Sequence, residues 1–397
     1  MQSASPELES STMALEANDD ASRRLSIVGV DPEPGFSGGE TQVLALTLAL
    51  NAAGHRAELI CDPAGRLFER ALAAGIRCHP LRIRNAIDLA AAMRLRTILR
   101  REHFDVVHFH TSRAHSMAPF VRDCASATVV TRRMDYRPNR LFAPFLFNRS
   151  VDRVIAISAG VADSLEAAGV DRNRIATIHS GVDCDRFCPP SIMQRDQARS
   201  SLGLGRDEIA VVAIGSLEAR KGHRYLLEAA ASLARTASKH APAIRYFIAG
   251  DGSIRREIEN QIAQLGCPKG ITMLGRIDDP LTLLWASDIF MMPSLKEGLG
   301  VAALEAMSCG LPTIASAVGG LAELVEHDRT GVQVEPAHSD QLASAIARLA
   351  ASPELRTRMG AAARIRVEQN YSMAAMAART LALYRACLNQ PRGEKKV

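Results

Sequence analysis

The feature that most constrains the fold of this chain is a repeated alternation of short apolar runs with longer amphipathic stretches. Near the start, Arg23–Val30 is predicted as a strand, Glu40–Ala53 as a helix and Arg56–Cys61 as a second strand. A similar alternation begins again at Ile209–Gly215. Strands separated by helices pair in parallel and are covered on both faces. We therefore expect an α/β protein of the doubly wound type, built from two similar halves.

The length of the chain also points to two domains. At 397 residues it is too long for one ordinary hydrophobic core. A polar connector that begins at Pro189-Pro190 marks the predicted boundary. The predicted organisation is a disordered leader over 1–22, an N-terminal Rossmann-like domain over 23–190, a linker over 191–206, a C-terminal Rossmann-like domain over 207–370, a C-terminal helix over 371–388 that packs back on the N-terminal domain, and a tail over 389–397.

Charge and cysteine usage exclude several classes of protein. The net charge of +5 is mild and does not indicate nucleic-acid binding, although the region 66–153 is markedly rich in arginine. The eight cysteines lack zinc-type spacing, so reduced thiols in a cytoplasmic protein are expected. The first 22 residues are acidic and lack the apolar core of a signal peptide. No apolar run is long enough to cross a bilayer.

The stretch Pro293–Pro312 is the strongest candidate for a ligand site. It holds Glu297 and Glu305 with seven residues between them, and a Gly-Leu-Gly turn follows the first glutamate. The apolar run Asp288–Pro293 precedes it and is predicted to be a buried strand. A glycine loop that enters a helix can hold a phosphate group at the helix N-terminus. A nucleotide-phosphate site at the carboxyl end of a parallel sheet is therefore expected.

Two features of the N-terminal half could face the same ligand. Gly38 and Gly39 precede a predicted helix and suit close backbone contact with a phosphate or sugar, with a simple tight turn as the less favoured alternative. The predicted strand Asp105–His110 ends in two histidines that its period of two places on one face. His110 lies nearest the strand end, where either a structural or a catalytic role is open.

A segment rich in arginine and aromatic residues runs from Arg132 to Arg149. Such a segment could lie on an anionic membrane or grip a phosphorylated acceptor, or it could be a solvated loop whose phenylalanines close a core edge. Nucleic-acid binding is disfavoured, because no recognised motif accompanies it. The candidate acceptor or membrane contacts are Arg132, Arg133, Arg137 and Arg140.

Taken together, the motifs resemble those of retaining GT-B glycosyltransferases of the family-4 type, also described as glycosyl transferases group 1. The resemblance covers roughly residues 25 to 388 and rests on the Glu297–Glu305 spacing and on motifs in the family's order. These motifs are Gly35-Phe-Ser-Gly-Gly39, Asp105-Val-Val-His-Phe-His110, Asp152-Arg-Val-Ile-Ala-Ile-Ser158, Gly181-Val-Asp183, Lys221-Gly222, Gly250-Asp-Gly252 and Val318-Gly-Gly320. It implies two facing Rossmann-like doubly wound domains with an interdomain cleft.

The resemblance also implies a role for each matching residue. The C-terminal domain would hold a UDP-, GDP- or ADP-sugar, with Glu305 on the ribose and Glu297 on the transferred sugar. Lys221 would neutralise the diphosphate, and His110 would lie beside the sugar and the acceptor, where it is the best candidate for assisting the chemistry. The candidate catalytic residues are therefore His110, Lys221 and Glu297. No metal or other cofactor is implied. The remaining candidate donor contacts are Gly38, Gly39, Ser216, Arg220, Gly250, Gly252, Arg276, Gly298, Leu299 and Gly300.

The chain differs from the family's pattern at one position that is expected to contact the diphosphate. Family members commonly carry arginine where this chain has Ser216, so one phosphate contact is in question and Arg220 is a possible substitute.

The leading hypothesis is a retaining, metal-independent transferase that adds a hexose or related sugar to a cell-envelope glycolipid or a polysaccharide precursor of the lipopolysaccharide type. It would be cytoplasmic, with a possible peripheral contact to the inner face of the plasma membrane. The alternatives are a soluble transferase acting on a small sugar or phosphosugar, and a catalytically silent GT-B protein that binds a sugar nucleotide.

Overall fold

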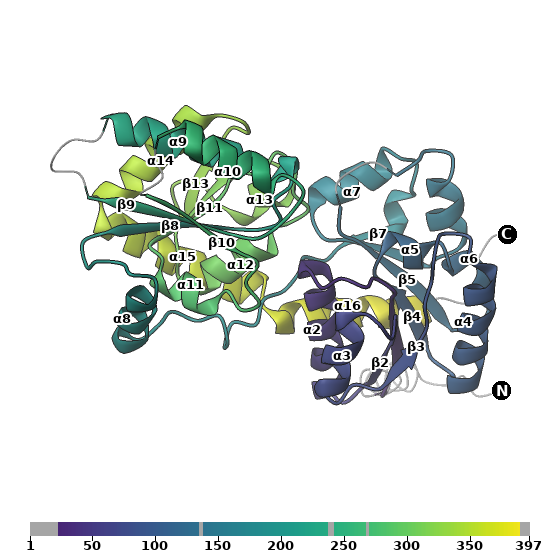
Figure 1. The fold of residues 1–397 in the computed structure, drawn as a ribbon. Coiled ribbons are helices and arrows are strands. Elements are labelled where there is room, and N and C mark those ends of the chain that lie inside the picture. The colour runs from purple at the N-terminus through teal and green to yellow at the C-terminus, as the bar shows by residue number, and fades with distance from the viewer. Residues whose placement is uncertain (1–22, 135–137, 237–241, 267–269, 390–397) are drawn as a thin grey trace, which may run out of the picture.

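The protein folds into two α/β units that lie side by side (Figure 1). The computed structural model describes residues 23–134, 138–236, 242–266 and 270–389. The predicted leader, Arg137 and residues 390–397 of the predicted tail lie outside the described residues. No helix among the described residues is long and apolar enough to cross a membrane.

The first unit is built on a sheet of seven parallel strands in the order β3-β2-β1-β4-β5-β6-β7. Its strands are β1 (Ser26–Asp31), β2 (Arg56–Cys61), β3 (Cys78–Pro80), β4 (Val106–Phe109), β5 (Ala127–Arg132), β6 (Arg153–Ala156) and β7 (Ile175–Thr177). Its helices are α2 (Gly38–Ala52), α3 (Arg66–Ala73), α4 (Leu89–Glu102), α5 (Ser112–His115), α6 (Ala118–Val121), the π-helix η1 (Pro144–Arg149), α7 (Ala159–Glu166) and the 3-10 turn η2 (Arg172–Arg174).

The second unit is built on a sheet of six parallel strands in the order β10-β9-β8-β11-β12-β13. Its strands are β8 (Ile209–Ile214), β9 (Ile244–Ala249), β10 (Ile271–Gly275), β11 (Ile289–Met292), β12 (Thr313–Ser316) and β13 (Gly331–Val334). Its helical elements are α8 (Ile192–Ser201), η3 (Ala219–Lys221), α9 (His223–Thr236), α10 (Arg255–Gln264), α11 (Leu281–Ala286), α12 (Val301–Ser308), α13 (Gly319–Leu324), α14 (Ser339–Ala351) and α15 (Pro353–Asn370).

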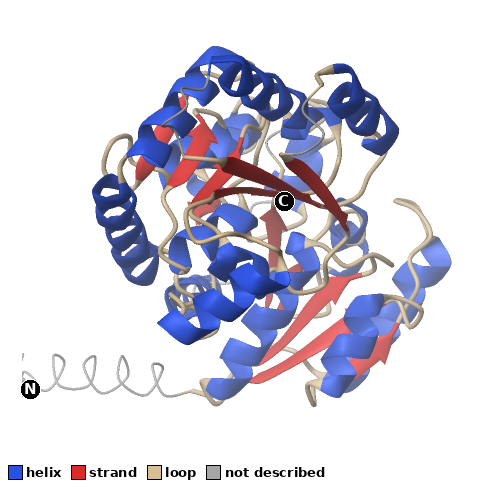
Figure 2. Cartoon of the chain, turned by 60° about the vertical axis from the view of Figure 1, so that its left-hand side comes forward, coloured by secondary structure: helices blue, strands red, loops and turns tan. Residues whose placement is uncertain are grey.

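The predicted α/β fold with two doubly wound, Rossmann-like units is confirmed. Helices flank the strands of both sheets, as the turned view shows (Figure 2). Strands covered on both faces become continuously apolar, and β8 and β11 carry that pattern with nearly every residue buried.

The segment 191–206, predicted as a linker, contains helix α8. Ser191 and Gln194 form a capping box at its start, which satisfies backbone groups that a helix end otherwise leaves open. Arg195 and Arg199 then reach from α8 to the carboxylate of Asp288 at 2.6 and 3.0 Å. These ion pairs attach the helix to the second unit, which polar composition alone did not reveal.

The last helix, α16 (Met373–Leu388), returns to the first unit and lies beside α2 (Figure 1). Tyr384 is fully buried there, and its hydroxyl lies 2.6 Å from Nδ1 of His108. Nε2 of His108 lies 2.6 Å from the hydroxyl of Thr131, so a chain of hydrogen bonds joins α16 to β4 and β5. The C-terminal helix therefore ties the end of the chain to the N-terminal sheet.

Each sheet reverses its strand order once, between β1 and β4 in the first unit and between β8 and β11 in the second. Adjacent loops diverge outside the carboxyl ends of the strands at such a point, which makes it the usual ligand crevice of an open α/β sheet. The loops that follow these four strands carry most of the residues predicted to bind a ligand.

We expect the Tyr384→Phe variant to lower the free energy of unfolding by about 1–2 kcal/mol, because it leaves a buried ring nitrogen of His108 without its partner. Urea denaturation would measure the change. Tyr225→Phe is the matched control, since no hydrogen bond to the Tyr225 hydroxyl occurs among the described residues. A loss of less than about 0.5 kcal/mol for Tyr384→Phe, the range of neutral surface changes, would contradict the role of this contact.

Candidate ligand site between the two units

The first wall of the site is the start of helix α2. Ser37 caps this helix, and Glu40 accepts hydrogen bonds from the Ser37 amide at 2.7 Å and its hydroxyl at 2.6 Å. This capping box holds Gly38 and Gly39 in the first turn of the helix. Their amides lie where the helix dipole favours negative charge, which agrees with the expected phosphate contact.

His110 follows β4 at the switch point of the first sheet. Its side chain is 5% exposed and its ring centroid lies 4.0 Å from that of His108, so the two histidines share a face as predicted. Burial, followed by the nearby histidine and Arg133, lowers the pKa of His110 well below its usual value, which keeps the ring neutral near pH 7. Its Nδ1 atom is buried and has no hydrogen-bond partner among the described residues.

The second wall is the switch point of the C-terminal sheet. Lys221 ends the turn after β8, and its ammonium group donates to Oε2 of Glu297 at 2.5 Å. The hydroxyl of Ser294 donates to the same oxygen at 3.2 Å. Both partners of the ion pair are largely buried, with side-chain exposures of 13% and 11%. The structure thus brings together Lys221, which was predicted to bind the diphosphate, and Glu297, which was predicted to bind the transferred sugar.

The two walls touch through glycines. An ideal Cβ on Gly38 would lie 3.6 Å from the Cβ of Val301, the first residue of α12. Gly300 caps α12 with φ of +94°, a conformation that favours glycine. An ideal Cβ on Gly298 would lie 2.2 Å from the backbone oxygen of Arg133. The N-termini of α2 and α12 therefore meet across the cleft, with Leu299 buried in the loop between Gly298 and Gly300.

Glu305 lies on α12, little more than one turn from the glycine loop, and is half-buried. Burial raises its pKa to about 7, with Arg186 opposing and Asp279 reinforcing the shift. No hydrogen bond to its carboxylate occurs among the described residues. A desolvated carboxylate of this kind is available to hydroxyl groups of a ligand.

Other predicted donor contacts have structural partners. Arg220 donates to Glu218 at 2.7 Å, so its charge is already paired. Gly250 and Gly252 pack on the backbone of the loop after β8, where an added Cβ would lie 1.8 Å from the Gly215 oxygen and 2.4 Å from the Leu217 oxygen. The observed contacts of Gly250 and Gly252 are therefore packing contacts with the loop after β8. Ser216 is half-buried at the end of β8.

Arg276 follows β10 and is exposed. Since β10 is an edge strand with β9 between it and β8, Arg276 lies two strands from the switch point.

The arginine-rich segment divides into inward and outward parts. Arg132 is buried because β5 extends through it, and it donates to the hydroxyl of Ser112 at 3.0 Å. Arg133 lies in the cleft beside Gly39 and Gly298. Arg140 is exposed, as is Arg149 at the end of the segment, and Arg140 donates to the backbone oxygen of Ala167 at 3.0 Å. A membrane contact through Arg132 or Arg133 is therefore incompatible with this structure.

Sequence reasoning missed Asp31, the last residue of β1. Its side chain is 1% exposed at the switch point, and burial followed by the charge of Glu40 raises its pKa to about 7. Its signal in the sequence was an acidic residue directly after the first predicted strand, Arg23–Val30.

Sequence reasoning also missed Glu323, which links the two units. Its carboxylate accepts from the amides of Ala159 and Gly160 at 2.8 and 3.3 Å, at the start of α7, and lies 3.1 Å from Nε2 of His179. Burial alone would raise the pKa of Glu323, but these hydrogen bonds outweigh it and lower the pKa. No local pattern marks this residue, because its partners lie more than 140 positions away in the chain.

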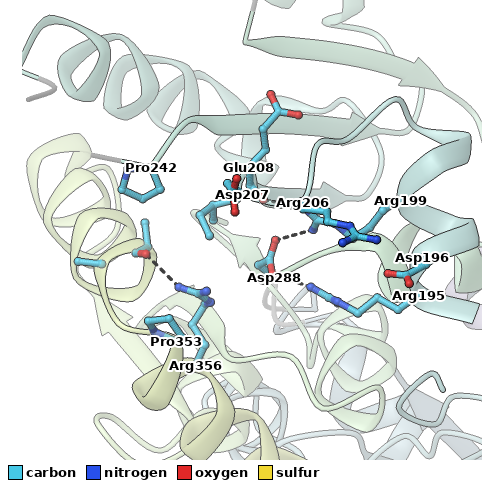
Figure 3. A pocket seen from close by; sticks show the side chains of 13 residues that line it. Arg195, Asp196, Arg199, Arg206, Asp207, Glu208, Pro242, Asp288, Pro353 and Arg356 are labelled. Atoms are coloured by element: carbon cyan, nitrogen blue, oxygen red, sulfur yellow. Dashed lines mark hydrogen bonds and ion pairs between the residues drawn. The ribbon is translucent and has the colours of Figure 1, made fainter. Parts of the chain in front are cut away.

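A cavity of about 430 Å³ lies elsewhere, at the amino end of the second sheet (Figure 3). Asp288 points into a group of arginines there and accepts from Arg195 and Arg199. Arg356 donates to the backbone oxygens of Leu349 and Ala350 at 2.7 and 3.0 Å. These contacts join α8 to the second unit at Asp288 and α15 to α14, which is a structural role.

Within the described residues, one cluster has donor atoms close enough for a metal ion, namely Glu58, His79 and Glu102. Arg56 and Arg77 already pair with both of its carboxylates. Two guanidinium groups in contact with the same oxygens disfavour a further cation. We interpret the cluster as an ion-pair network on the outer strands of the first sheet.

We expect Gly298→Ala to force the two units apart, because its Cβ would overlap a backbone oxygen of the other unit. The expected loss of stability is about 1–3 kcal/mol, typical of overpacking, with an increased radius of gyration in X-ray scattering. Gly270→Ala is the control, since its Cβ would meet only the oxygen of Ile244 at 3.6 Å. Wild-type stability and radius in Gly298→Ala would contradict the close contact.

Comparison with known proteins agrees with this geometry. The model of Glycosyltransferase Family 4 matches residues 36–186, and that of Glycosyl transferases group 1 matches residues 194–366. An Escherichia coli UDP-Gal:alpha-D-GlcNAc-diphosphoundecaprenol alpha-1,3-galactosyltransferase is 27% identical over 73% of this chain and 79% of its own length. A D-inositol 3-phosphate glycosyltransferase of Pseudarthrobacter chlorophenolicus is 34% identical over 60% of this chain but only 56% of its own length.

A solved structure shows the same fold at low sequence identity. Anabaena HepE, determined in complex with UDP and glucose, superposes with a TM-score of 0.80 at 20% identity, over 91% of this chain and 100% of that one. The two family models cover the two units one after the other, in the order in which the sheets occur. The chain therefore belongs to the GT-B glycosyltransferases of the family-4, group 1 type.

Proposed function

We propose that the protein is a retaining glycosyltransferase that moves a sugar from a nucleoside-diphosphate sugar to a cell-envelope glycolipid or polysaccharide precursor. One observation carries the proposal. Two helix N-termini meet in the cleft, with Lys221, Glu297 and Glu305 arranged on the second wall. The name of the E. coli relative, which includes a UDP-sugar and a diphosphoundecaprenol acceptor, supports both substrate classes. The UDP bound to the structurally similar HepE supports the donor class.

In this proposal the donor lies along the second wall. Glu305 accepts hydrogen bonds from the ribose hydroxyls, as a carboxylate does well for two neighbouring hydroxyls. Glu297 and the amides of the 298–300 loop hold the transferred sugar. Lys221 and the N-termini of α2 and α12 face the diphosphate and stabilise the charge that develops on it as it leaves. These groups supply positive charge without a metal ion.

The hydrogen bonds that each side chain already makes indicate its role in the proposed reaction. Glu297 already accepts hydrogen bonds from Lys221 and Ser294, so we assign it to binding rather than to nucleophilic attack. The acceptor hydroxyl attacks on the face that the diphosphate leaves, and a leaving phosphate oxygen takes its proton. The anomeric configuration is thereby retained. His110, neutral and with an unpartnered Nδ1, is placed to hydrogen-bond the sugar or the acceptor.

An exposed apolar surface supports the membrane part of the proposal. Leu141, Phe142 and Phe145 are 84%, 68% and 55% exposed where the chain enters η1. Arg140 lies beside them and is also exposed. Aromatic side chains next to arginines suit the boundary between the head groups and acyl chains of an anionic membrane. The contact would therefore be made by apolar side chains of the segment together with its outward arginine.

A soluble phosphosugar acceptor is the second candidate function. The inositol 3-phosphate relative favours it by name and is more similar in sequence over the region that it matches. A catalytically silent sugar-nucleotide-binding protein is the third possibility, and a transfer assay separates it from the first two.

Donor binding should depend on pH through Glu305. Its pKa of about 7 means that the carboxylate is ionised above pH 7 and protonated below it. Since the ionised form accepts the ribose hydrogen bonds, the Kd for UDP-glucose should rise about tenfold between pH 8 and pH 6. Isothermal titration calorimetry would measure it. Glu305→Gln should bind more weakly at pH 8 with a flatter profile, and an unchanged slope in that variant would assign the titration to another group.

The acceptor class can be decided by transfer assays on a lipid-linked saccharide in anionic vesicles and on a water-soluble phosphosugar. We expect Phe142→Ser/Phe145→Ser to reduce vesicle binding about tenfold or more, because two exposed aromatic rings no longer enter the membrane. Ile365→Ser, on an exposed position of α15, is the matched control. Vesicle binding that survives the double substitution would overturn the membrane contact.

Transfer to the soluble acceptor alone would favour the second function. Glu297→Gln should abolish transfer to either acceptor. If neither the wild type nor Glu297→Gln transfers sugar to either acceptor, the result would favour the third function, a catalytically silent protein that binds a sugar nucleotide.

A further inference from the structure

We propose that Arg133 is a phosphate-binding residue of the cleft, supplied by the N-terminal unit, which pairs with a phosphate group of the bound substrate. This inference rests on the proposed function and names a residue that the resemblance did not assign to the donor. Arg133 follows directly after β5. Its Cδ lies 3.7 Å from an ideal Cβ on Gly39, and its backbone oxygen lies 2.2 Å from an ideal Cβ on Gly298. The residue thus stands between the two glycine loops.

The guanidinium of Arg133 has no carboxylate in contact among the described residues. Its one hydrogen bond there runs from Nη1 to the hydroxyl of Ser180 at a long 3.4 Å. Its Nε atom is buried and has no partner there. Burial lowers the pKa of Arg133 to about 10, so the group stays charged at neutral pH. Arg133 as a whole is half-buried, so its charge is partly desolvated. A partly desolvated charge without an ion-pair partner is costly, and a bound anion would remove that cost.

Two carboxylates lie within electrostatic range of Arg133 but are otherwise engaged. Glu40 is held by the amide and hydroxyl of Ser37 in the capping box of α2. Asp31 accepts from the amide of Glu33 at 3.1 Å, and its raised pKa leaves it partly protonated near neutral pH. Neither forms an ion pair with Arg133 among the described residues. Positive charge therefore remains in this part of the cleft.

The surroundings of Arg133 favour phosphate over other anions. The N-termini of α2 and α12 meet beside it, and each presents amides and a positive dipole end. Lys221 lies on the opposite wall, at the switch point of the second sheet. Arginine is suited to phosphate because its planar fork can donate two parallel hydrogen bonds.

The sequence leaves a role for such a group. Ser216 after β8 carries no charge, and the neighbouring Arg220 is paired with Glu218. Arg133 approaches the same cleft from the other unit and supplies a second positive charge in addition to that of Lys221. Because this charge comes from the first unit, phosphate binding would also hold the two units together.

The phosphate could belong to the donor or to the acceptor, and the test distinguishes them. Thermal-shift titration with UDP, GDP and ADP first identifies which diphosphate the wild type binds. Calorimetry then compares that diphosphate with its nucleoside for wild type, Arg133→Leu and Arg133→Lys. Inositol phosphate is compared with inositol in the same way. Arg94→Leu, an exposed arginine on α4 of the same unit, is the matched control.

If the donor supplies the phosphate, Arg133→Leu should weaken diphosphate binding about 10- to 100-fold and leave nucleoside binding within about twofold. Arg133→Lys should lie between that variant and the wild type. If the acceptor supplies it, the loss should fall on inositol phosphate instead. Equal affinities of wild type and Arg133→Leu for both phosphorylated probes would overturn this inference alone. Failure of the wild type to bind any of the three diphosphates would overturn the proposed function, and this inference with it.

Discussion

Two helix N-termini that point at one another constrain the rest of this structure. Helices α2 and α12 belong to different sheets, yet Gly38 and Val301 bring their first turns into contact. Each N-terminus carries a partial positive charge, so the arrangement is unfavourable unless negative charge lies nearby. The carboxylates of Glu40 and Glu297 supply part of that charge from opposite sides. A bound phosphate group would supply the remainder, which is the physical basis of both proposals.

Further contacts between the two units must hold them together for this contact to persist. Glu323 does so by accepting hydrogen bonds from the first amides of α7, where a helix N-terminus meets a carboxylate rather than another N-terminus. Gly160 and Gly319 allow α7 and α13 to approach closely at the same place, since an added Cβ on Gly160 would lie 3.3 Å from the Cα of Gly319. Helix α16 adds a third attachment through Tyr384. The interface thus combines two kinds of contact. The N-terminus of α7 meets the carboxylate of Glu323, which is electrostatically favourable, whereas the N-termini of α2 and α12 meet one another, which is unfavourable.

The accuracy of prediction from the sequence depended on how local each signal was. Strands buried on both faces are visible as apolar runs, so the two sheets were predictable, as was the placement of His108 and His110 on one face. Helix α8 was missed because its polar surface resembles a connector, and its attachment depends on a distant partner, Asp288. Arg133 was predicted as an acceptor or membrane contact together with its neighbours, because an arginine-rich segment does not reveal which side chains turn inward.

By itself, the sequence determined the α/β class, the two-unit organisation and the glycine loop that carries Glu297 and Glu305 into a helix. Those features follow from hydrophobic period, glycine placement and residue spacing, which are properties of short segments. Only the tertiary structure decided which charges meet in the cleft. It pairs Lys221 with Glu297 and Arg220 with Glu218, and it leaves Arg133 facing the helix ends. Pairing between distant residues depends on the distance and burial that folding creates, and no local pattern encodes either quantity.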